Sequence, residues 1–270
     1  MNQKQTTTHP LYKQFLDRLA KEKRLVIFAQ TIIFVGFFFL WELSSRMNWI
    51  DPLIFSAPSR IGQLFIDNLL NGSLWYHMRI TIFETLAGFL IGTLVGILLA
   101  SLLWYSERFS KISDPYLVVF NALPKVALGP IIIVTLGPGY LSIITLGAII
   151  CVIVTALVIF NGFSSVDPNY VKVLSSFGST KWQNFNHAIL PSTLPTIIST
   201  FKVNVGLSWV GVIVGEFLVA SKGLGYLIVY GFQVFNFTLV LYSLVLIAFL
   251  AALMYQGVAY FEKWLLKKVH

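Results

Sequence analysis

The stretch that decides the fold is DPNYVKVLSSFGSTKWQNFNHAILPSTLP, residues 167–195. It is the longest interval in the second half of the chain that cannot sit in lipid, and the runs on either side are apolar and long enough to cross a bilayer. This segment therefore predicts an ordered loop at a membrane face. Its surroundings predict a bundle of transmembrane helices.

Composition supports an integral membrane protein. The chain has 270 residues, 57% of them hydrophobic and 11% charged, which lies far outside the range of soluble proteins. A span takes about 20 residues, so several spans fill the chain and leave no room for a soluble catalytic or nucleotide-binding domain. The net charge of +8 indicates cytoplasmic loops that face anionic membrane lipid rather than a nucleic-acid partner. The single cysteine, Cys151, lies in an apolar run and predicts inert packing.

Apolar runs predict six spans, with polar tails at residues 1–24 and 262–270. The expected spans cover residues 25–43, 79–105, 115–136, 140–163, 196–220 and 237–261, and residues 164–195 form the long loop between the fourth and fifth. An amphipathic helix near residues 58–69 is expected at the outer face. Gly88, Gly92 and Gly96 share one helical stripe, which predicts close helix packing. Pro124 and Pro130 predict a break in the third span.

Positive charges orient this bundle. Of the nineteen Lys and Arg residues, the predicted topology places thirteen inside and four outside, and the remaining two lie within spans. Cytoplasmic loops carry the excess of Lys and Arg. Both termini and the long loop are therefore expected in the cytoplasm.

The long loop predicts a helix, a turn and a second helix. Pro168 suits a first helical turn, Gly178 suits a left-handed helix end, and Trp182, Phe185 and Ile189 follow at helical spacing. Exposed apolar side chains of this kind indicate a protein partner. The alternative is an amphipathic hairpin on lipid headgroups.

Four segments resemble the permease subunits of ABC importers, and cover the chain from about residue 51 to its end. FGSTKWQNFNHAILPSTLP resembles the cytoplasmic EAA loop: Gly178, Leu190 and Pro191 match, whereas Lys172 to Leu174 replace Glu-Ala-Ala and Ala188 replaces Ile. Three other segments are similar to permeases of the nitrate, sulfonate and taurine type: WYHMRITIFETLAGFLIGTLVGILLA (75–100), DPYLVVFNALPKVALGPIIIVTLGPG (114–139) and GEFLVASKGLGYLI (215–228).

The resemblance implies an all-α fold of the type I ABC importer permease kind in the bacterial plasma membrane. It also implies two copies of this chain, two ABC ATPase subunits docked on the loops, and an extracellular binding protein that delivers a small solute. Because the chain has no GxxxxGK[ST] motif, ATP and Mg²⁺ would be used by the partner. The expected ATPase-coupling residues are Lys172, Leu174, Gly178, Lys181, Trp182, Phe185, Leu190 and Pro191.

Polar residues within spans usually face a cavity or a partner. The candidates for the translocation pathway are Asn121, Lys125, Lys202, Asn204 and Glu216. Lys125 suits a small anion such as nitrate, an alkanesulfonate or taurine, and Asn121 lies four residues earlier on the same face. The alternatives are snorkelling or ion pairing for the lysines, a bond between helices for Asn204, and a packing pair for Glu216. Glu84 is expected to meet Arg79 or a neighbouring helix.

Other functions remain as alternatives. Similar permeases serve pyrimidine vitamin precursors and other small organic solutes. A self-contained channel or secondary transporter would carry two repeated halves, and no repeat is seen. No spacing of His, Asp or Glu predicts a metal site, and no nucleophile, base and orienting group predict catalysis.

Overall fold

The computed structural model describes residues 10–269, with side chains placed for 15–265. Residues 1–9 of the predicted N-terminal tail and residue 270 of the predicted C-terminal tail lie outside the described range. The chain divides into two units, Met1–Gln63 and Leu64–His270.

The first unit is built around one long helix, α1 (Pro10–Arg46). The carboxylate of Glu42 accepts hydrogen bonds from the backbone N–H and the hydroxyl of Ser59 and pairs with Arg46 at 2.6 Å. The Trp41 indole donates to the carbonyl of Phe55 at 3.0 Å. These contacts fold the segment after α1 back onto its end. Residues 10–24 of the predicted polar tail form the first part of α1.

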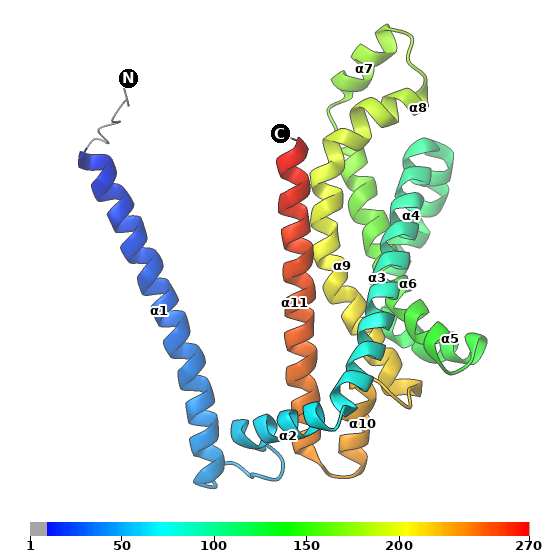
Figure 1. The fold of residues 1–270 in the computed structure, drawn as a ribbon. Helices are drawn as coiled ribbons and strands as arrows, with labels where there is room; N and C mark the ends of the chain where they lie inside the picture. The colour runs from blue at the N-terminus through cyan, green and yellow to red at the C-terminus, as the bar shows by residue number, and fades with distance from the viewer. Residues whose placement is uncertain (1–9, 270) are drawn as a thin grey trace. The chain divides into compact units, whose positions relative to one another are not determined.

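The second unit is entirely helical over its described residues (Figure 1). After α2 (Pro58–Leu70), which begins in the first unit, come α3 (Ser73–Tyr105), α4 (Glu107–Ala122), a 3-10 turn η1 (Lys125–Leu128), α5 (Gly129–Leu136), α6 (Tyr140–Ser164), α7 (Pro168–Ser176), α8 (Lys181–Asn184), a π turn η2 (Phe185–Ile189), α9 (Leu190–Val219), α10 (Leu224–Gln233) and α11 (Phe237–Val269).

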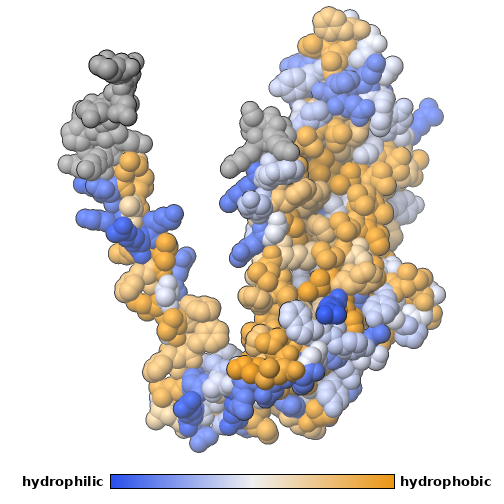
Figure 2. All heavy atoms as spheres, in the orientation of Figure 1, coloured by the Kyte–Doolittle hydropathy of each residue, from blue (hydrophilic) through white to orange (hydrophobic). Residues whose placement is uncertain are grey.

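Five described helices are long and apolar enough to span a membrane, or six if the bent pair formed by α4 and the segment Lys125–Leu136 is one span. Hydrophobic residues cover the sides of the bundle, and hydrophilic residues gather toward its ends (Figure 2). Such a surface is stable only against lipid or another apolar surface. The predicted all-helical membrane fold is confirmed, and the predicted count of six spans requires that the bent pair form one span.

Glycines set the centre of the bundle, where α3, α6 and α9 pack together. A Cβ atom on Gly92 would lie 2.6 Å from the Ala148 carbonyl of α6, and one on Gly211 of α9 would lie 2.6 Å from the Cα of Gly147. Small residues allow helix backbones to approach this closely. The close packing predicted for the stripe of Gly88, Gly92 and Gly96 is confirmed.

Some predicted boundaries are wrong. The stretch 106–114, expected as a loop, is the start of α4, because the Ser106 hydroxyl caps the helix by accepting from the Phe109 N–H at 3.2 Å. The third span bends by 96° after Ala122, since Pro124 disfavours helix at the residue before it. Pro130 then opens α5, where a missing N–H costs little.

The helices that contain the predicted fifth and sixth spans extend beyond the predicted span bounds. α9 already begins at Leu190 and contains Pro195, and together with α8 and η2 it forms one continuous helical stretch, Lys181–Val219. Prolines are tolerated in a first helical turn, so Pro191 does not end the preceding helix. α11 continues to Val269 instead of ending at residue 261.

Candidate functional site

The segment between α6 and α9 forms the predicted helix, turn and helix. Asp167 caps α7 by accepting from the Asn169 N–H at 2.9 Å. Gly178 has a φ of +77°, a left-handed conformation that favours glycine and ends α7. The hydroxyl of Thr180 and the side chain of Gln183 then cap α8 reciprocally.

α7 carries the exposed apolar side chains of this hairpin. Phe177 is 86% exposed at its end, and Tyr170 and Val173 are more than half exposed. The helix stands at one end of the bundle, beyond the ends of α3 and α6 (Figure 1). The coupling residues predicted from the sequence do not include Tyr170 or Phe177. For Phe177 the signal was its position next to Gly178, since a side chain beside a tight turn has few neighbours.

The second half of the hairpin differs from the prediction. Phe185 and Ile189 are buried rather than exposed. The Phe185 ring packs against Trp104 and Phe163 at centroid distances of 5.1 and 5.3 Å. The apolar residues Phe185 and Ile189, which lie in η2 directly after α8, thus anchor the hairpin to the bundle.

The remaining coupling candidates fall into two groups. Lys172 is exposed on α7, together with the half-buried Leu174. Lys181 and Trp182 lie against the end of α3, and Leu190 packs on the core around Phe185. Pro191 is exposed in the first turn of α9. A partner that docks on this hairpin therefore meets α7 first.

The bend after α4 brings together two of the predicted pathway residues. The Lys125 ammonium donates to the backbone carbonyl of Asn121 at 2.9 Å, and it lies 3.5 Å from the side-chain oxygen of Asn121. Asn121 also lines a hollow of about 540 Å³ between α4 and α6. Asn161 of α6 lines the same hollow and was missed from the sequence, because it stands near the end of an otherwise apolar span.

The structure gives partners to the other three pathway candidates. Lys202 of α9 pairs with Glu262 of α11 at 2.5 Å. Asn204 is fully buried, and its amide donates to the hydroxyls of Thr93 and Thr155 at 2.8 and 2.7 Å. These are the ion pair and the inter-helix bond that the sequence left open as alternatives. In this single chain, Asn204 faces no open space.

Glu216 belongs to a buried network at the opposite end of the bundle. Its carboxylate accepts from the Thr81 hydroxyl at 2.7 Å and from the Gly225 N–H at 2.5 Å. The carboxyl group of Glu84 lies against it. The network ties α3 and α9 to the start of α10. Glu84 therefore meets a neighbouring helix and not Arg79.

A smaller hollow of about 210 Å³ opens beside this network, between the α5–α6 and α9–α10 turns. Glu84 lies at its wall, and Lys222 lies at its rim with the ammonium 4.7 Å from the centre of the Tyr140 ring. A hydrogen bond with the Tyr140 side chain raises the pKa of Lys222. Lys222 therefore keeps its positive charge at this end of the bundle.

Comparison with known proteins identifies the family. Residues 92–269 match the family model described as binding-protein-dependent transport system inner membrane component. The chain belongs to this family. It is a multi-pass permease component of a binding-protein-dependent transport system.

The relatives match over most of the chain. It is 28% identical to the putative aliphatic sulfonates transport permease protein SsuC of Bacillus subtilis over 84% of this chain and 83% of the relative. It is 30% identical to the formylaminopyrimidine transport permease protein ThiX of Halalkalibacterium halodurans, over 73% and 78%. The taurine transport system permease protein TauC of Escherichia coli is 22% identical over 81% of both chains.

Solved structures share the fold. A chain of the MetNI methionine ABC transporter in an inward-facing conformation matches with a TM-score of 0.60 and 19% identity, over 75% of this chain and 96% of that one. A chain of a bacterial ABC transporter that imports alginate matches with a TM-score of 0.61 and 15% identity, over 91% and 98%. The fold is that of type I ABC importer permeases.

Proposed function

We propose that two copies of this chain form the membrane pathway of an ATP-driven importer in a bacterial plasma membrane. Two ABC ATPase subunits would dock on α7 from the cytoplasm, and a solute-binding protein would deliver the substrate at the opposite end. Both termini would lie in the cytoplasm. The observation that carries this proposal is the capped hairpin of α7 and α8, with Phe177 exposed at its end.

The hairpin is suited to transmit movement. Its second helix continues through η2 into α9 without a break, and the buried Phe185 fixes it to α3 and α6. A displacement of α7 would therefore tilt α9, because no flexible loop lies between α8 and α9 to absorb the movement. ATP and Mg²⁺ would act in the partner, and their binding would shift the spans between outward- and inward-open states.

The proposed substrate is a small anion, such as nitrate, an alkanesulfonate or taurine. The bend at Lys125 supports this, because it places a cation and the Asn121 side chain next to the hollow shared with Asn161. A cation at membrane depth favours a negative solute. Two permeases among the relatives are named for the transport of aliphatic sulfonates and of taurine.

A second substrate class is an uncharged heterocycle, as in a pyrimidine vitamin precursor. The two amides of Asn121 and Asn161 in one hollow favour it, since amides donate and accept hydrogen bonds to ring nitrogens and carbonyls. The relative named for formylaminopyrimidine transport and one named for riboflavin transport point the same way.

Lys125→Met separates these classes in proteoliposomes that hold the reconstituted importer. For an anion, the variant is expected to lower the apparent affinity for transport about tenfold or more, because it removes a charge-assisted hydrogen bond. Asn161→Leu is expected to weaken uptake of a heterocycle more strongly than Lys125→Met does. Arg108→Met, which removes a positive charge from α4 away from the hollow, is the control.

Two results would contradict the proposal. Unchanged anion uptake by an assembled Lys125→Met variant removes Lys125 from the pathway. Uptake that proceeds without an ATPase partner or ATP would replace the importer with a channel or a secondary transporter.

A further inference from the structure

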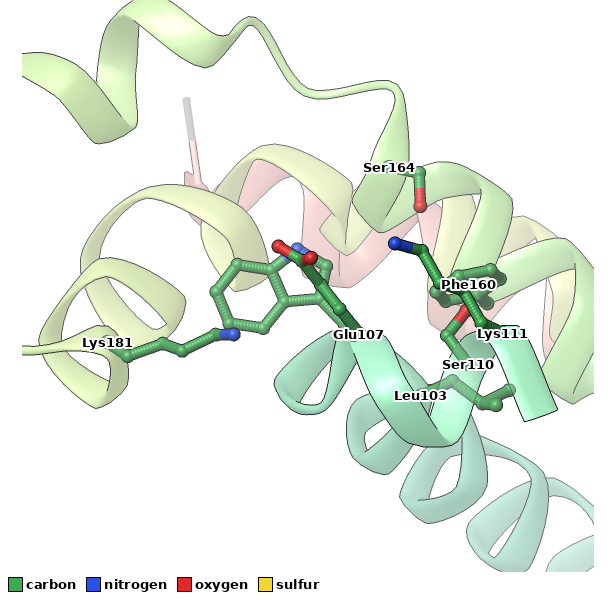
Figure 3. Close-up of a pocket in the computed structure, with 8 residues that line it drawn as sticks. Leu103, Glu107, Ser110, Lys111, Phe160, Ser164 and Lys181 are labelled. Carbon is green, nitrogen blue, oxygen red and sulfur yellow. The ribbon is translucent and has the colours of Figure 1, made fainter. Parts of the chain in front are cut away.

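A polar hollow of about 350 Å³ lies where α3 ends, bordered by α4, α6 and α8. The polar side chains that line it are Glu107, Ser110, Lys111, Ser164 and Lys181. Figure 3 shows Lys181 and Lys111 reaching in from opposite sides, with the Glu107 carboxylate between them. With two ammonium groups and one carboxylate, the lining carries a net charge of one positive unit.

An apolar groove of about 560 Å³ follows α3 away from this end. Its lining residues are Leu98, Ser101, Leu102, Tyr105, Trp182 and Phe185. Leu98 and Leu102 are more than half exposed. Because its lining is mainly apolar, the groove suits a hydrocarbon chain.

Lys181 joins the hollow to the groove. Its ammonium lies 5.6 Å from the ring centres of both Trp104 and Tyr105. Trp104 lines the polar hollow, whereas Tyr105 and the next residue of α8, Trp182, line the groove. The two spaces are thus neighbours across one pair of rings.

The depth of this junction is that of lipid headgroups. Trp104 and Tyr105 close the span α3, and Trp and Tyr at the end of a span sit at the membrane–water interface. Lysine near a span end extends its charge to the same level. The hollow therefore faces the headgroup region, and the groove faces the acyl chains below it.

We propose that the hollow and the groove together bind one anionic phospholipid. Its phosphodiester would lie between Lys111 and Lys181, and one acyl chain would follow Leu98 and Leu102. Basic pockets between membrane helices bind anionic headgroups, and a phosphodiester with one negative charge balances the lining. Because α8 borders both spaces, the bound lipid links α3 to the hairpin that carries α7.

The test is lipid retention by the purified full-length chain, measured by native mass spectrometry during titration with phosphatidylglycerol. The wild type is expected to hold one molecule tightly. Lys111→Met and Lys181→Met should each weaken binding about fivefold, and Lys181→Arg should retain it. Arg108→Met removes the same charge from an exposed site next to Glu107 and should change nothing.

Further variants identify the occupant. Glu107→Gln should bind phosphatidylglycerol as tightly as the wild type or more tightly. Ser101→Phe, which fills the groove, should weaken a long-chain lipid and leave dihexanoyl phosphatidylglycerol unaffected. Unchanged thermal unfolding of each variant shows that the fold is intact.

Four outcomes would overturn the proposal. The first is undiminished retention by the Lys111→Met/Lys181→Met double variant, and the second is an equal loss with Arg108→Met. The third is a preference for phosphatidylethanolamine that Glu107→Gln abolishes, which would indicate a zwitterionic lipid. The fourth is displacement of the lipid by inorganic phosphate at equal concentration, which would leave a free-anion site only.

Discussion

Replacing Gly211 with leucine is expected to destabilise the folded chain strongly. A Cβ at this position would lie 2.6 Å from the Cα of Gly147, which is backbone and cannot move aside without separating α9 from α6. Overpacking a well-packed interior costs about 1–3 kcal/mol or more, a large part of the stability of a typical domain. Gly211→Ala is expected to fold with a lowered unfolding temperature.

Gly206→Ala is the matched control, because it lies on the same helix and its Cβ would meet no atom within 4 Å. Helix propensity favours alanine over glycine by up to about 1 kcal/mol, so this variant should be as stable as the wild type or more stable. Thermal unfolding in detergent measures both. Equal stability of Gly211→Ala and Gly206→Ala would contradict the close contact of α6 and α9.

Phe177→Asp is expected to weaken ATPase binding by about thirtyfold or more. An exposed aromatic side chain at the centre of an interface often contributes about 2 kcal/mol or more to binding, and a carboxylate would be buried without a partner in its place. The measurement is the affinity of the purified permease for its ATPase, together with ATP-driven uptake.

Phe235→Asp is the control for the negative charge that Phe177→Asp introduces. Phe235 is also highly exposed, lies in the turn between α10 and α11 at the end of the bundle opposite α7 (Figure 1), and has a φ of 54°, a conformation that aspartate tolerates. The Phe235→Asp variant should leave ATPase binding intact. If the two variants bind ATPase equally well, α7 is not the docking surface.

The fold is largely predictable from the sequence because lipid imposes a strong constraint. Long apolar runs must be helical, so the spans, the amphipathic α2 and the break at Pro124 follow from pattern alone. Errors arise where capping competes with polarity: Ser106 starts a helix in a polar stretch expected to be a loop. Polar sequence indicates which segments lie outside the membrane, but it does not indicate where a helix ends.

The candidate site is less predictable, because long-range packing decides which side chains remain exposed. Phe185 and Phe177 are equally apolar, yet one packs against Trp104 and the other faces outward. Likewise Lys202 has its partner, Glu262, sixty residues away on another helix. Only Lys125 and Asn121, four residues apart, were paired from local spacing.

Crosslinking from position 177 tests the docking of α7 most directly. Cys151 is the only cysteine of the chain and is fully buried, so Phe177→Cys introduces a single accessible thiol. In membranes that contain the assembled importer, a short bismaleimide is expected to join Phe177→Cys to a cysteine introduced on the permease-facing surface of the ATPase, whereas Phe235→Cys forms no such link. Reaction of Phe177→Cys with an impermeant maleimide added outside intact cells, together with no link to the ATPase, would contradict the account.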